Sequence, residues 1–128
     1  MKFGKIIVWI NCWLFVGFGL GFIFIPEALA TSITGAAPTT PSAMTDMRAT
    51  YGGMALGLAS IFGLCAKNEG SIRLGAQGVL AVMLGLAVAR VIGILFDGAP
   101  NIFIWLLLFA EAIMGILAAL ALRKMAVE

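Results

Sequence analysis

Few residues of this chain are suited to chemistry, and they lie within or at the ends of long apolar stretches. They are two arginines, a tyrosine and two carboxylates: Arg48, Tyr51, Arg90, Asp97 and Glu111. Guanidinium groups bind carboxylates and phosphates through paired hydrogen bonds, and a phenol hydroxyl can donate one more. This combination indicates either a closed network of ion pairs or a binding site for an anionic group.

Catalytic and metal chemistry find little support in the residue types. The chain has no histidine, which removes the commonest general base and metal ligand. It also lacks a Walker-type loop, an HExxH helix and any arrangement that would activate a serine or cysteine. Two thiols, Cys12 and Cys65, make a poor zinc site without histidine, and we expect them to be packing residues. We therefore expect a protein that is not an enzyme, with no catalytic residue, metal or cofactor.

The composition is that of a membrane protein. Apolar residues make up 62% of the 128 positions, charged residues make up 11%, and the mean hydropathy is +1.12. Soluble domains have far fewer apolar and more charged residues. Most basic residues lie between or beyond the apolar runs, which suits membrane topology rather than nucleic-acid binding. We expect one membrane domain and no nucleic-acid partner.

Four apolar runs are long enough to cross a bilayer, which requires about 20 helical residues. They cover approximately residues 6–25, 47–66, 74–96 and 102–122. Six basic residues fall on one side of this arrangement: Lys2, Lys5, Lys67, Arg73, Arg123 and Lys124. The positive-inside rule then places both termini in the cytoplasm. The sequence thus predicts an all-α integral membrane four-helix bundle, residues 1–128, in the cytoplasmic (inner) membrane.

The first run has an alternative reading as a signal peptide. Lys2 and Lys5 precede an apolar stretch, and Ala28-Leu29-Ala30 resembles a cleavage site. A signal peptide has an apolar region of about 7 to 15 residues, whereas the run here extends from residue 6 to residue 25. We therefore expect a retained transmembrane span.

The outer loop, residues 26–46, is the longest connection. Pro26 suits the first position of a short interfacial helix, and Gly35 suits its end. The loop would lie over the outer mouth of the bundle, either as a lid or as a simple tether. The second helix begins either at Thr40 and Pro41 or near Asp46, and only the earlier start carries Arg48 about two turns into the helix.

Glycines and alanines recur at four-residue spacing in several spans. This spacing lets another helix approach closely in lipid. We expect helix packing at Gly17, Gly21, Gly53, Gly57, Gly85 and Gly93.

Arg90 and Glu111 lie at similar depths in the third and fourth spans. Arg90 is about 9 Å and Glu111 about 13 Å below the outer boundary, from the helical rise per residue. A charged residue inside a span costs about 2.5 to 3.5 kcal/mol even on lenient scales, so each needs a partner. The sequence predicts that they pair.

The remaining polar residues would join this pair in a single cluster near the outer face. Arg48 would pair with Asp97 or Asp46, and the Tyr51 hydroxyl would supply a further hydrogen bond. Such a cluster admits three interpretations: a structural network, a ligand site, or proton coupling through Glu111.

Several of these features resemble the bacterial four-span family called domain of unknown function 4345. The resemblance rests on Pro26, the stretch Asp46-Met47-Arg48-Ala49-Thr50-Tyr51-Gly52-Gly53, Arg90 with Gly93, Asp97-Gly98, and Glu111. It implies a four-helix integral membrane fold and a bacterial membrane. It implies no activity, ligand or catalytic residue.

Three functions are then to be weighed. The first is a non-catalytic subunit or helper that packs against other membrane protein subunits, or against copies of itself, among membrane lipids. The second is a binder or transporter of a lipid headgroup or small amphipathic anion at the outer cluster. The charges of the cluster weaken this second function, because Asp97 and Glu111 balance the two arginines and leave no net attraction for an anion. The third, an enzyme, lacks a recognisable catalytic arrangement, and the first is the expectation.

Overall fold

The chain is helical apart from short turns. The computed structural model describes residues 1–127, and within them the helices are α1 (Lys2–Phe24), α2 (Pro26–Thr34), α3 (Pro41–Met47), η1 (Arg48–Gly53), α4 (Met54–Lys67), η2 (Glu69–Ser71), α5 (Ile72–Asp97) and α6 (Ile102–Val127). α3, η1 and α4 form one continuous helix, in which η1 is a π-helical turn. Four helices are long and apolar enough to cross a membrane: Lys2–Phe24, Pro41–Lys67, Glu69–Asp97 and Ile102–Val127. The predicted all-α architecture with four such helices is confirmed.

The helices beside the long loop begin and end at several of the predicted signals, although the second long helix begins at Pro41 rather than at residue 47. α2 begins at Pro26, and Gly35 ends it with φ of 85°, a left-handed conformation that favours glycine. The second long helix takes the earlier of its two predicted starts, because the Thr40 hydroxyl accepts a hydrogen bond from the Ala43 amide at 3.1 Å. Arg48 therefore lies about two turns inside this helix.

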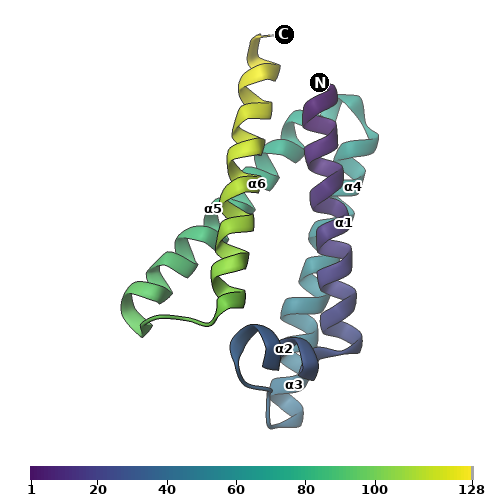
Figure 1. Ribbon diagram of the computed structural model, residues 1–128. Coiled ribbons are helices and arrows are strands. Elements are labelled where there is room, and N and C mark those ends of the chain that lie inside the picture. Colours follow the sequence, from purple (N-terminus) through teal and green to yellow (C-terminus); the bar gives the residue numbers. More distant parts are fainter. Residues whose placement is uncertain (128) are drawn as a thin grey trace.

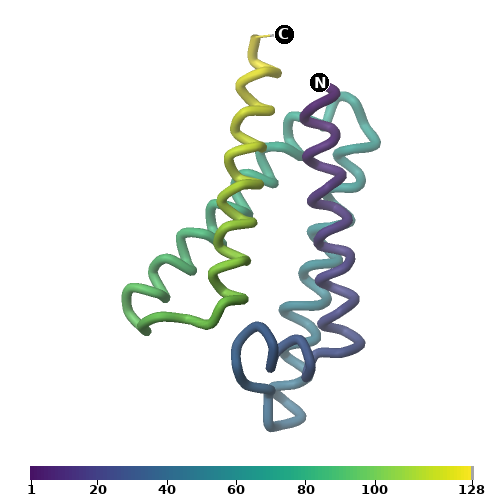
Figure 2. The backbone as a smooth tube through the Cα atoms, in the orientation of Figure 1, coloured from purple at the N-terminus to yellow at the C-terminus, as the bar shows by residue number. Residues whose placement is uncertain are grey.

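The helices form two pairs that meet near the termini. α1 packs mainly against α4, and α5 packs mainly against α6. Figure 1 shows both termini at one end of the molecule, with α2 and α3 at the opposite end. We call the end with the termini the terminal half (residues 2–13, 59–84 and 113–127) and the other end the distal half (14–58 and 85–112). The backbone of α5 and α6 diverges from α1 and α4 toward the distal end (Figure 2).

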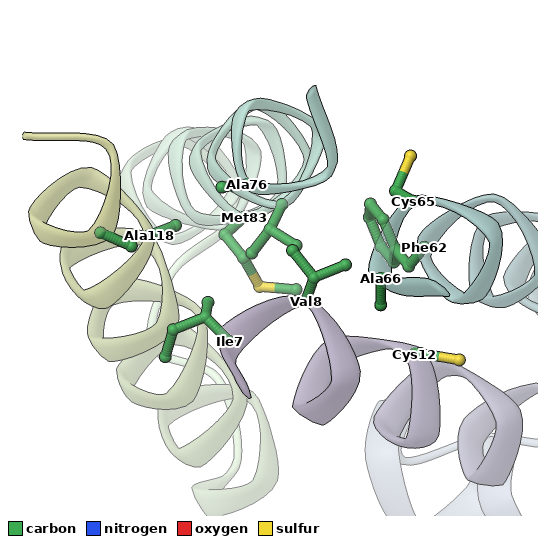
Figure 3. Packing of buried hydrophobic residues seen from close by; sticks show 11 residues of the cluster. Ile7, Val8, Cys12, Phe62, Cys65, Ala66, Ala76, Met83 and Ala118 are labelled. Carbon is green, nitrogen blue, oxygen red and sulfur yellow. The ribbon is translucent and has the colours of Figure 1, made fainter. Parts of the chain in front are cut away.

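The apolar core lies in the terminal half, where all four long helices contribute side chains. Figure 3 shows Val8 of α1 between Met83 of α5 and Ala66 of α4, with Ile7 on the side of α6. Cys12 and Cys65 belong to this core as expected, and both are free thiols. Every buried residue of α5 lies between Ile72 and Met83. The remainder of α5 thus extends beyond the core.

Most of the glycines predicted to mediate packing do not do so within the chain. A methyl group added at Gly17, Gly53, Gly57 or Gly85 would meet nothing within 4 Å among the described residues. Gly93 would meet only Asp97 of its own helix, whereas Gly21 does contact another element, the side chain of Leu29 in α2. Sequence spacing identifies small residues that share a helix face, but it does not identify the face that meets a neighbour.

Candidate functional site

The predicted pair between Arg90 and Glu111 is present. The Nε–H group of Arg90 donates to both carboxylate oxygens of Glu111, at 2.9 and 2.8 Å. The Glu111 side chain is only 8% exposed and the Arg90 side chain is 23% exposed. The pair joins α5 to α6 and neutralises two charges that would be costly if left single in an apolar environment.

This pairing leaves part of the guanidinium unused. An arginine has five N–H donors, and only the Nε donor reaches Glu111. Among residues 1–127, the terminal nitrogens of Arg90 have no hydrogen-bonded acceptor. Arg90 lines an open pocket of about 320 Å³ together with Asp97 and the turn at 98–100. Asp97 is not within ion-pairing distance of Arg90.

Arg48 has a different partner from the one predicted. Its Nη1 group donates to the backbone carbonyl of Ile23, in the last turn of α1. Within the described part of the chain no carboxylate forms an ion pair with Arg48, so the predicted pairing with Asp46 or Asp97 is wrong. The last carbonyls of a helix lack partners within it. Arg48 therefore caps α1 rather than joining the Arg90 pair.

The π-helical turn at Arg48–Gly53 packs directly on α1. A methyl group at Gly19 would lie 2.9 Å from the carbonyl oxygen of Gly52, and one at Gly52 would lie 2.6 Å from Cγ1 of Ile23. Two facing glycines thus allow the close contact that holds Arg48 beside the end of α1. Single π turns are often found at functional sites.

Tyr51 contributes an aromatic contact rather than the predicted hydrogen bond. Its ring stacks on Phe22 with centroids 5.2 Å apart. The residue is 47% exposed, and its hydroxyl has no hydrogen-bond partner among the described residues. The predicted cluster is therefore divided: Arg90, Asp97 and Glu111 lie on α5 and α6, whereas Arg48 and Tyr51 lie beside α1.

Arg48 lines a second and larger open pocket that the sequence did not reveal. Its volume is about 660 Å³, and its walls come from the end of α1, from α2, and from the helix that contains Arg48. The lining residues are Phe24, Ile25, Pro26, Glu27, Ala28, Thr31, Ser32, Met44 and Arg48. Glu27 is the functional candidate that was missed. The sequence feature that could have identified it is its position, directly after Pro26 at the start of the predicted interfacial helix.

A buried amide was also missed. Asn11 of α1 is fully buried, its Nδ2 group donates to the Ile7 carbonyl at 2.9 Å, and its Oδ1 atom has no partner among the described residues. An asparagine in the middle of an apolar span is itself a signal, because such amides usually bond to a neighbouring helix. No group of three or more histidine, cysteine or acidic residues within 1–127 is arranged to hold a metal.

The comparisons with known proteins identify one family. A family model described as "Domain of unknown function (DUF4345)" matches residues 3–122, which is nearly the entire chain. No curated protein and no solved structure matches.

Proposed function

The chain belongs to the DUF4345 family, and from this premise we propose that it is a small non-catalytic integral membrane protein that packs within a larger membrane assembly. Its partners are other membrane protein subunits or further copies of this chain. The positive-inside distribution of basic residues favours cytoplasmic termini in a bacterial inner membrane.

The observation that carries this proposal is the uncovered small-residue face of α5. Ala81, Gly85 and Ala89 are spaced by four residues, and all three are exposed. They lie away from the face that carries Met83 and Arg90 toward α6. In lipid, such a face favours contact with another helix, because backbones can approach closely and gain dispersion and weak hydrogen bonds.

The distal half of α5 has little support from the rest of the chain. It has no buried residue beyond Met83, although Arg90 attaches it to α6. The helix therefore presents a long surface that the rest of the described residues, 1–127, leave exposed. A second transmembrane protein would complete it.

The test is native mass spectrometry of the tagged chain after gentle extraction from its own membrane. We expect the wild type to carry a stoichiometric protein partner or to form a defined homo-oligomer. Gly85→Leu should reduce the complexed fraction at least tenfold, a loss of about 1.4 kcal/mol. Val91→Leu is the matched control, because Val91 is exposed on the same helix but is turned away from the face of Gly85.

The proposal would be refuted if the extracted wild type were detected only as a monomer with no bound protein. A complex that tolerates Gly85→Leu as well as it tolerates Val91→Leu would also refute it, since the α5 face would then not be the contact.

A second candidate is binding or transport of a lipid headgroup or small amphipathic anion at the distal polar residues. Arg90 is a weak centre for it, because Glu111 already neutralises the guanidinium. Arg48 favours it, because its charge has no acidic partner in the described chain and it lines the larger pocket.

A further inference from the structure

The larger pocket contains two opposite charges that do not meet. Arg48 and Glu27 both line it, yet no ion pair links them. Arg48 uses one terminal nitrogen for the Ile23 carbonyl, which leaves further N–H donors on the same guanidinium. Glu27 has no hydrogen-bonded side-chain partner among residues 1–127. The pocket thus offers a cationic donor and an anionic acceptor at separate places.

The backbone around the pocket adds further polar groups. The first-turn amides of a helix have no partner within it, and they favour anions. Glu27 and Ala28, which carry two such amides at the start of the nine-residue α2, line the pocket. The Thr31 and Ser32 hydroxyls already donate to the carbonyls of Glu27 and Ala28, at 2.8 and 2.9 Å. Their oxygens can therefore only accept.

Apolar side chains adjoin these polar groups. Phe24 is 75% exposed and Ile25 is 55% exposed, and both line the pocket at the end of an apolar helix long enough to cross a membrane. A pocket that combines separated opposite charges with exposed apolar residues at such a helix end suits an amphipathic molecule with a zwitterionic polar group.

We propose that this pocket binds a phosphoethanolamine group, the headgroup of an ethanolamine phospholipid, with Arg48 on the phosphate and Glu27 on the ammonium. The phosphate and the primary ammonium of this group are joined by a short ethylene linker, so one headgroup carries both of the charges that complement Arg48 and Glu27. A glycerol headgroup offers no cation to Glu27. A choline headgroup has no N–H to donate, and this pocket has a single aromatic residue, Phe24, rather than an aromatic cage. The inference rests on the membrane placement proposed above and does not require a protein partner.

The test measures which lipid the purified full chain retains. The protein is exchanged into an equimolar mixture of ethanolamine, glycerol and choline phospholipids with identical acyl chains, and retained lipid is counted by native mass spectrometry. We expect the wild type to retain the ethanolamine lipid at least fivefold over each of the others. Glu27→Gln should bring the ethanolamine and glycerol lipids to near parity, while Arg48→Gln should lower retention of all three.

Glu27→Gln is the decisive variant, because the Glu27 side chain forms no hydrogen bond or ion pair with another described residue. Its thermal midpoint should equal that of the wild type, whereas Arg48→Gln also removes the cap on α1. Glu69→Gln is the matched control, since Glu69 lies in the turn between α4 and α5 and pairs with Lys5. It should keep the wild-type preference.

Equal retention of the three lipids by the wild type would overturn the proposal, as would an unchanged preference in Glu27→Gln. Competition with soluble phosphoethanolamine separates the two sources of the group: displacement of the lipid at equal concentration assigns the pocket to the free molecule, and no displacement assigns it to the lipid. Alkaline extraction of native membranes tests placement separately. Release of the chain by alkali would refute the proposed membrane placement. Retention of the chain, combined with no lipid preference, would refute only the proposed headgroup site.

Discussion

The two halves of the molecule are held together by different interactions. In the terminal half, apolar residues of all four long helices are buried against each other. In the distal half, α1 still packs on the second long helix through Gly19 and Gly52, but the only buried residue of α5 or α6 is Glu111. The distal parts of α5 and α6 are instead attached by polar contacts, including a hydrogen bond from the Asn101 side chain to the Ile33 carbonyl at 3.0 Å.

This difference indicates that one half of the molecule contributes most to stability and the other half is the one suited to binding. Lipid tails are as apolar as leucine, so helices in a membrane associate through close packing and polar contacts rather than through the hydrophobic effect. The terminal half provides close packing among all four long helices. The distal half has polar contacts, two open pockets and an uncovered helix face, and it is therefore the half suited to a ligand or a partner.

The largest effect should follow from breaking the polar contact of the distal half. Glu111→Ala leaves Arg90 as an unpaired charge inside the helix pair, which we expect to cost about 3–5 kcal/mol of unfolding free energy. Arg90→Ala combined with Glu111→Ala removes both charges and should recover most of that loss. Unfolding in mixed detergent micelles measures both variants. A double variant no more stable than Glu111→Ala would mean that the pair does not hold α5 to α6.

An intermediate effect should appear when close packing in the terminal half is disturbed. A methyl group at Gly75 would lie 2.8 Å from Cβ of Cys65 and 3.1 Å from the γ carbons of Val8. We expect Gly75→Ala to lower the unfolding free energy by about 1–3 kcal/mol, the usual cost of overpacking. Gly85→Ala is the control, because its methyl group meets nothing and alanine favours the helix by about 1 kcal/mol. Equal effects at both positions would contradict the difference between the halves.

The smallest effect should come from the one buried amide of the terminal core. Asn11 has a buried Oδ1 atom without a partner among the described residues, so Asn11→Leu removes little that is favourable. We expect the unfolding free energy to change by less than about 1 kcal/mol, whereas Ile7→Ala on the same helix should cost about 2–5 kcal/mol. Thermal unfolding followed by circular dichroism compares them. A large loss for Asn11→Leu would show that the terminal half also depends on a polar contact.

Local patterns in the sequence were sufficient for the helices and for one contact between them. Thr40 with Pro41, and Pro26 with Gly35, marked helix ends that depend only on nearby backbone groups. The pairing of Arg90 with Glu111 followed from depth, because both charges lie inside apolar helices at similar levels and each is costly without an opposite charge. Lys5 and Glu69, by contrast, form an exposed ion pair that depth did not select.

The partner of Arg48 could not be found in the same way. A backbone carbonyl carries no residue-type signal, and any helix end offers several of them. The choice of Ile23 depends on the π-helical turn and on the contact between Gly19 and Gly52, which together bring the second helix against the end of α1. Glu27 entered the site for the same reason, because α2 folds back beside Arg48.

The sequence by itself determined four apolar helices, the short helix α2, and the ion pair between Arg90 and Glu111. These follow from composition, from periodicity and from the cost of charge in an apolar environment. Only the tertiary structure decided which glycines make contact, which carbonyl Arg48 caps, and that the polar residues form two sites rather than one. Those outcomes depend on how each helix is rotated and inclined relative to its neighbours, and the divergence of α5 and α6 from α1 and α4 is a property of that packing.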